Sequence, residues 1–159
     1  MPDATMKDPQ DALASFARDH RGIDSLVLGG RFKPAAERLA DFKEFDRRLE
    51  RHIRCEEDIL FPALARRGEQ WQNGPIRVML EEHKDIRAHK AAALAALERG
   101  DLEMAARHEK ILFPLLSHHN AKEEQVLYPA CAALLETQDA LLAAEKLANS
   151  ENMEGTHEN

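Results

Sequence analysis

The chain has 159 residues, of which 43% are hydrophobic and 32% charged, and its formal net charge is -7. A chain of this length is expected to form one compact domain around a single core. The acidic balance repels phosphate backbones and anionic headgroups, so neither nucleic acid nor a membrane surface is an expected partner. Because no basic run precedes an apolar stretch at the start, and no run of about 18 apolar residues occurs, we expect neither secretion nor membrane insertion.

Abundant Ala, Leu, Glu, Lys and Arg, with one Tyr and one Trp, favour helix and predict an all-α fold. In chain order, Asp8 and Pro9 are a cap and a first-turn residue for a helix that ends near Gly29. Part of residues 31–41 is predicted to be a loop or a short separate helix. The further helices are predicted over residues 34–67, 73–100 and 101–136.

The domain is predicted to span residues 1–149, and residues 150–159 are predicted to form a disordered tail. Pro114 lies inside the last predicted helix and should kink or break it. Cys55 and Cys131 form no CxxC motif or disulfide framework, so both are expected to be reduced thiols in a cytoplasmic protein. A redox role for Cys55 beside a metal is an alternative, although a free cysteine usually behaves as a small hydrophobe.

Each predicted helix has an apolar stripe that includes histidine. In the first, Leu13, Phe16, His20, Ile23 and Val27 keep the alternating three-and-four spacing of a buried face. The other stripes are Phe42, Phe45, Leu49, His52, Glu56, Ile59 and Ala63; Ile76, Leu80, His83, Ile86 or Arg87, Leu94 and Leu97; and Leu112, Leu116, His119, Glu123, Val126 and Ala130. Inward stripes with short connections predict an antiparallel up-down-up-down four-helix bundle.

A short motif occurs twice, at residues 52–64 and from residue 118 onward, with the pattern His-x-x-x-Glu-Glu-x-(Ile/Val)-Leu-(Phe/Tyr)-Pro-Ala. On a helix, the histidine and glutamate of each copy lie on one face, one turn apart. A further histidine precedes each copy: His20 lies 32 residues before His52, and His83 lies 36 before His119. The chain is therefore predicted to contain an internal pseudo-two-fold repeat.

Two glutamates on buried stripes predict a metal, because an ionised carboxylate in an apolar core costs several kcal/mol unless it is compensated. Imidazole and carboxylate donors without thiolate suit iron, manganese or zinc. The candidate ligands are His20, His52, Glu56, His83, His119 and Glu123. Six ligands divided between two halves indicate two ions, each with two histidines, bridged by the glutamates and leaving about two coordination positions open.

The other histidines fit this pattern less well. His118 stands five residues before Glu123 but about 100° off the stripe, so His119 is favoured. His89 and His108 have no matching partners, and surface roles are expected for both. A ferritin-like site would need GluxxHis pairs, and the single such pair joins Glu154 to His157 in the predicted tail.

With its Leu-Phe-Pro segments, the pattern over residues 20–130 resembles the hemerythrin-like HHE cation-binding family. The resemblance implies a non-haem di-iron centre, oxo- or hydroxo-bridged, with four terminal histidines and bridging Glu56 and Glu123. It also implies reversible binding of O2, or handling of NO or peroxide, at an open iron position. Zinc or manganese in place of iron is an alternative.

The chain departs from oxygen-carrying hemerythrins in two places. Those proteins have a second histidine one turn after the first on the third helix, and here that position is Arg87, which leaves the site more open. Asp24 holds the equivalent place after His20 and is either an extra ligand or, as we favour, an ion-pair partner of Arg87 or a surface residue. Family members that repair iron-sulfur clusters carry an N-terminal cysteine, and residues 1–12 contain none.

Three functions follow as hypotheses. The first is a protein that binds or senses O2 or NO at the di-iron centre. The second is an enzyme that removes peroxide or NO, or an iron-sulfur cluster repair protein. The third is a bundle held by redox-silent zinc. The sequence leaves open the native ion, the physiological ligand, the redox partner and the oligomeric state.

Overall fold

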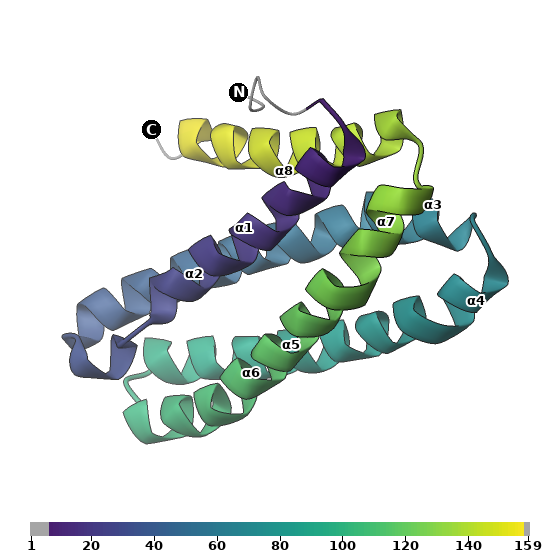
Figure 1. Cartoon of the computed structure of the whole chain (residues 1–159). Coiled ribbons are helices and arrows are strands. Elements are labelled where there is room, and N and C mark those ends of the chain that lie inside the picture. The colour runs from purple at the N-terminus through teal and green to yellow at the C-terminus, as the bar shows by residue number, and fades with distance from the viewer. Residues whose placement is uncertain (1–6, 158–159) are drawn as a thin grey trace.

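The computed structural model describes residues 7–157, with side chains as far as Asn149, and within this range it contains helices and connections but no strand. Figure 1 shows long helices that lie alongside one another, consistent with a helical bundle. The predicted all-α class is confirmed. Within the described range, every helix is too short or too polar to span a membrane.

The first connection contains a short separate helix and a short loop, as predicted for part of residues 31–41. Helix α1 (Pro9–Val27) begins where Asp8 accepts a hydrogen bond from the backbone N–H of Asp11 at 2.9 Å. Gly29 then adopts a φ of 69°, which glycine reaches without a steric penalty, and one 3-10 turn, η1 (Gly30–Phe32), follows. Helix α2 (Ala35–Cys55) starts directly after Pro34, so most of residues 31–41 is helical.

The remaining elements are π-helical or α-helical: η2 (Glu56–Leu60), α3 (Phe61–Ala65), α4 (Glu69–Trp71), η3 (Gln72–Ile76), α5 (Arg77–Glu98), α6 (Leu102–Lys122), η4 (Glu123–Leu127), α7 (Tyr128–Leu134) and α8 (Thr137–His157). The third stretch begins at Glu69 instead of residue 73, because Pro75 is accommodated in the wide turn η3. Asp101 caps α6 by accepting from the Met104 N–H at 3.1 Å, and α6 continues through Pro114 without a break.

Helix α8 was not predicted. It packs against α1, α2 and η2 and lies across one side of the bundle (Figure 1). Its buried residues, Ala140, Ala143, Ala144 and Leu147, follow helical spacing, but three of them are alanines, which make a weak apolar stripe. Residues 150–157, predicted to be a disordered tail, are the end of this helix, and residues 158–159 lie outside the described part.

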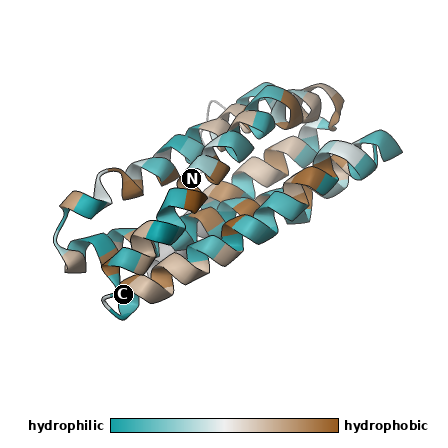
Figure 2. Cartoon of the chain, turned by 90° about the horizontal axis from the view of Figure 1, so that it is seen from below, coloured by the Kyte–Doolittle hydropathy of each residue, from teal (hydrophilic) through white to brown (hydrophobic). Residues whose placement is uncertain are grey.

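The core consists of two apolar clusters with a polar layer between them. One cluster contains Phe16, Leu60 and the buried face of α8, and the other contains Phe45 and Ile86. Figure 2 shows hydrophilic residues along the outer faces of the helices. The clusters meet at the stripe histidines: along α1, for example, His20 lies between Phe16 of the first cluster and Ile23 of the second. The chain therefore places the stripe histidines and their glutamates between the two apolar clusters.

After each glutamate the buried face moves by about one residue from the predicted stripe, although Ala63 is buried as predicted. Val126 is 46% exposed and Ala130 only half-buried, whereas Leu127, Tyr128 and Cys131 are buried. Likewise Ile59 is half-buried while Leu60 and Phe61 are buried. The cause is the π-helical turn that begins at each glutamate, because an extra residue in a turn rotates the face that follows it. In α5, Met79 is buried and Leu80 is not, so the prediction for Leu80 was also wrong.

Candidate metal centre

Six buried side chains converge between the helices, and all six are the predicted candidates. Each is 0–3% exposed: His20 on α1, His52 near the end of α2, Glu56 at the start of η2, His83 on α5, His119 on α6 and Glu123 at the start of η4. They form two groups of four, and both groups contain the two glutamates. Within each group, one donor atom from every residue lies within 4.8 Å of the others.

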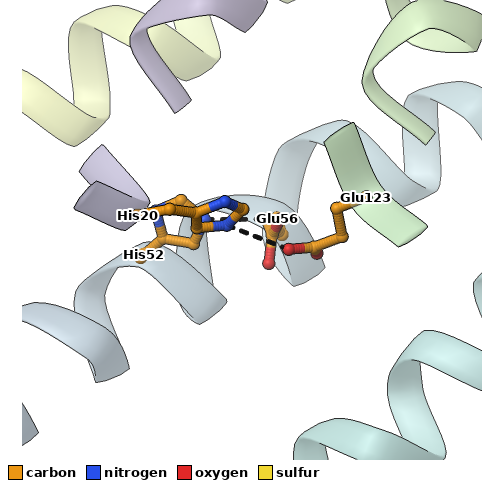
Figure 3. A group of neighbouring side chains, drawn as sticks. All are labelled: His20, His52, Glu56 and Glu123. Carbon is orange, nitrogen blue, oxygen red and sulfur yellow. Dashed lines mark ion pairs between the residues drawn. The ribbon is translucent and has the colours of Figure 1, made fainter. Parts of the chain in front are cut away.

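The first group joins His20 and His52 to the two carboxylates. His20 Nε2 lies 3.1 Å from Glu123 Oε1, and His52 Nε2 lies 3.5 Å from Glu56 Oε2. Figure 3 shows both imidazoles turned toward the two carboxylates.

The second group uses the other oxygen of each carboxylate. His83 Nε2 lies 3.3 Å from Glu56 Oε1, and His119 Nε2 lies 3.3 Å from Glu123 Oε2. Each glutamate thus offers one oxygen to each group. This is the arrangement in which a carboxylate can bridge two cations.

Hydrogen bonding indicates that the second group needs a cation. Glu56 Oε1, Glu123 Oε2 and His83 Nε2 are buried and have no hydrogen-bond partner among the residues that the structure describes. A buried polar atom without a partner costs about 1–3 kcal/mol, and more when it is charged. A metal ion between these atoms would remove that cost, so the donor set fits a metal.

Electrostatics around the glutamates agree with this fit. Burial alone would raise the pKa of Glu56, but the neighbouring His52 lowers it well below its usual value. Burial alone would lower the pKa of His52, yet the charge of Glu56 and a hydrogen bond to Asp19 raise it to about 10. Burial also opposes the charge on His119, but Glu123 raises its pKa to about 9. Protons on the imidazoles therefore balance the carboxylates, and a bound cation would displace those protons.

A ring of four carboxylates holds the imidazoles from outside. Each contacts a Nδ1 atom: Asp19 on His52 at 2.8 Å, Glu57 on His83 at 2.8 Å, Glu82 on His119 at 2.9 Å and Glu124 on His20 at 3.1 Å. A carboxylate at Nδ1 fixes the tautomer that leaves Nε2 free for a metal. Sequence reasoning missed this ring, although its signal was present, since each acid directly precedes a stripe histidine or follows a stripe glutamate.

Basic side chains support the ring in turn. Arg48 lies 3.2 Å from Asp19, Lys122 donates to Glu82, and Arg87 Nη2 lies 3.1 Å from Glu57 and 2.9 Å from Glu50. Arg87 therefore pairs with Glu50 and Glu57 instead of Asp24, so of the two favoured alternatives for Asp24 the ion pair was wrong. Asp24 is exposed and belongs to neither metal group, as expected of a surface residue.

Replacing Glu57 by glutamine is expected to lower metal affinity about 10- to 100-fold, the usual cost of losing a partner of a histidine ligand. The amide cannot supply the negative charge that Glu57 presents to His83 and Arg87. Competition with a chelator of known affinity measures the change. Glu44→Gln is the matched control, because Glu44 pairs with Arg47 at 2.6 Å on the outside of α2. Equal affinities of the two variants would show that the ring does not tune the site.

The other candidate residues lie outside the centre. His118 is exposed whereas His119 is buried, so His119 is the one that faces inward. His89 and His108 contact one another, with their Nδ1 atoms 3.2 Å apart, and belong to neither group. Cys55 and Cys131 are free and buried, and burial raises their pKa to about 11 and about 12. Both remain protonated at neutral pH, which gives no support to a redox role for Cys55.

Tyr128 is the residue that sequence reasoning missed at the centre itself. Its buried hydroxyl lies 2.7 Å from Glu56 Oε2, 3.0 Å from His52 Nε2, 3.1 Å from His20 Nε2 and 3.4 Å from Glu123 Oε1. Burial raises the pKa of the phenol well above its usual value, and the two carboxylates add to the effect.

The π turn η4 explains why Tyr128 reaches the centre. At 100° per residue, a regular α-helix would place Tyr128 about 140° away from Glu123. Here the Tyr128 N–H instead donates to the Glu123 carbonyl, five residues back, and the wider turn brings the ring inward. The available signal was the (Phe/Tyr) position of the repeated motif, where the first copy has Phe61.

Comparison with known proteins gives one family. A family model described as hemerythrin HHE cation binding domain matches residues 5–131. No curated protein and no solved structure matches the chain.

Proposed function

Because this chain belongs to the hemerythrin HHE cation-binding domain family, we propose that it holds two iron ions and binds or senses O2 or NO. His20 and His52 would hold one ion, His83 and His119 the other, and the two glutamates would bridge them. The observation that carries this proposal is that both four-residue groups share the same two buried carboxylates. Iron, when bound, supplies a redox-active Lewis acid that can take a small ligand at a free coordination position.

The protein's own residues would select for small ligands. All six donors are 0–3% exposed, and apolar clusters lie on both sides of them. A ligand of two or three atoms fits such a closed centre better than a larger substrate. The ring of outer carboxylates would keep the imidazoles in place while the ligand binds and leaves.

We also propose an up-down-up-down bundle with an internal pseudo-two-fold repeat. The support comes from the outer ring, which follows the same rule in each half. In each half, the acid that precedes the first histidine is hydrogen-bonded to the second histidine of the same half. Asp19, before His20, contacts His52. Glu82, before His83, contacts His119. The second glutamate of each motif is hydrogen-bonded to the first histidine of the other half, Glu57 to His83 and Glu124 to His20.

Metal analysis combined with optical spectra of the reduced protein tests the function. We expect about two irons per chain and a spectrum that changes reversibly on exposure to O2 or NO. Sustained turnover of peroxide or NO would contradict the binding function and support an enzyme that removes these molecules. A colourless protein that retains zinc would contradict both. We further propose a cytoplasmic protein, which two free, buried thiols support.

A further inference from the structure

We propose that the Tyr128 hydroxyl is a fifth donor at the metal position of His20 and His52. The two metal positions would then be unequal, and a small ligand would bind at the position of His83 and His119. This inference rests on the proposed two-metal function and adds to it a protein ligand and the place where the external ligand binds.

The Tyr128 hydroxyl lies at ligand-to-ligand distance from the four donors of the first group. In an octahedral site with metal–donor bonds of about 2.1 Å, neighbouring donors lie about 3.0 Å apart. The Tyr128 oxygen lies 2.7–3.4 Å from all four donor atoms of the first group. The Tyr128 oxygen is therefore at the distance expected of a fifth octahedral ligand from the two histidine nitrogens and the two carboxylate oxygens.

The two groups differ in their hydrogen bonding. Glu56 Oε1, Glu123 Oε2 and His83 Nε2, the buried atoms of the centre without a hydrogen bond among the described residues, all belong to the second group. The Tyr128 hydroxyl contacts the donors of the first group and reaches both of its histidines. The second group therefore has four protein donors, and the first has five.

In the other copy of the motif, phenylalanine stands where Tyr128 stands in this one. Phe61 stacks on the His83 ring, with centroids 5.7 Å apart and planes 17° apart, and it has no polar atom to offer a metal. Arg87, one turn after His83, is directed to Glu50 and Glu57 and is a cation in any case. With an oxo or hydroxo bridge taking one position on each ion, the first ion would have six ligands and the second five, so the open position would lie on the His83 and His119 side.

Binding through Tyr128 has a defined chemical balance. The phenol O–H bond breaks, an oxygen–metal bond forms, and the proton leaves to solvent without any change in oxidation state. A phenolate is a hard, anionic oxygen donor, and such donors favour iron(III) over iron(II). The ion held by Tyr128 would therefore be the harder of the two to reduce.

The test uses the full chain loaded with iron(III). A phenolate bound to iron(III) produces a visible charge-transfer band, and resonance Raman excitation in that band enhances tyrosine ring vibrations. Tyr128 is the single tyrosine of the sequence, so enhanced tyrosine vibrations in the unaltered protein can come from no other residue. We expect both signals in the unaltered protein and neither in Tyr128→Phe.

Matched measurements separate the possible failures. Tyr128→Phe should keep the second ion and bind the first at least tenfold more weakly, as measured by chelator competition. Phe61→Leu alters the equivalent aromatic position without touching the phenol and should keep the band. Two irons per chain without enhanced tyrosine vibrations would overturn the role of Tyr128 and leave the proposed function intact. Failure of the unaltered protein to bind iron would overturn both.

Discussion

Replacing Glu56 and Glu123 together by glutamine is expected to release most of the bound metal, so that the content falls from about two ions per chain by more than tenfold. Each carboxylate offers one oxygen to each group, so the double variant removes an anionic donor from both positions at once. Four imidazoles and the Tyr128 hydroxyl would remain, with no carboxylate to bind the cations directly. Losing only an outer partner typically costs about 10- to 100-fold in affinity, and losing direct ligands costs more.

Elemental analysis after dialysis measures this result. The control is Glu37→Gln with Glu98→Gln, which removes two negative charges from exposed positions on α2 and α5 and should leave metal content unchanged. Circular dichroism of both double variants shows whether the helices persist. Stoichiometric metal in the folded Glu56 and Glu123 variant would mean that the ligand set is wrong.

The second large effect concerns α8, the helix that covers α1, α2 and η2. Ala143→Glu is expected to destabilise the protein by about 3–5 kcal/mol, because it places a carboxylate at a position that is 0% exposed within the first apolar cluster. Urea denaturation measures the free energy of unfolding. The midpoint should fall accordingly.

Leu142→Glu is the matched control, since it introduces the same side chain one residue earlier, at a position that is 46% exposed. Its effect should remain within about 0.5 kcal/mol, as is usual for surface substitutions. If the two variants were equally stable, α8 would not be packed on the bundle as described.

Much of the site was predictable from the sequence because helical spacing is a local property. A histidine and a glutamate four residues apart share a face in any α-helix, so His52 with Glu56 and His119 with Glu123 follow from the chain alone. The same reasoning placed His20 among apolar residues at the right spacing. The family match over residues 5–131 agrees with that reading of the motif.

The sequence by itself determined the helical class, the helix cap at Asp8, and the six inward side chains, since each depends on neighbours within a turn or two. The tertiary structure alone decided which carboxylate holds which imidazole, because Glu124 and His20 are 104 residues apart. It also decided the place of Tyr128. The turn at Glu123 contains one extra residue, which rotates the helix that follows it. A prediction that assumes 3.6 residues per turn throughout the helix does not include that rotation.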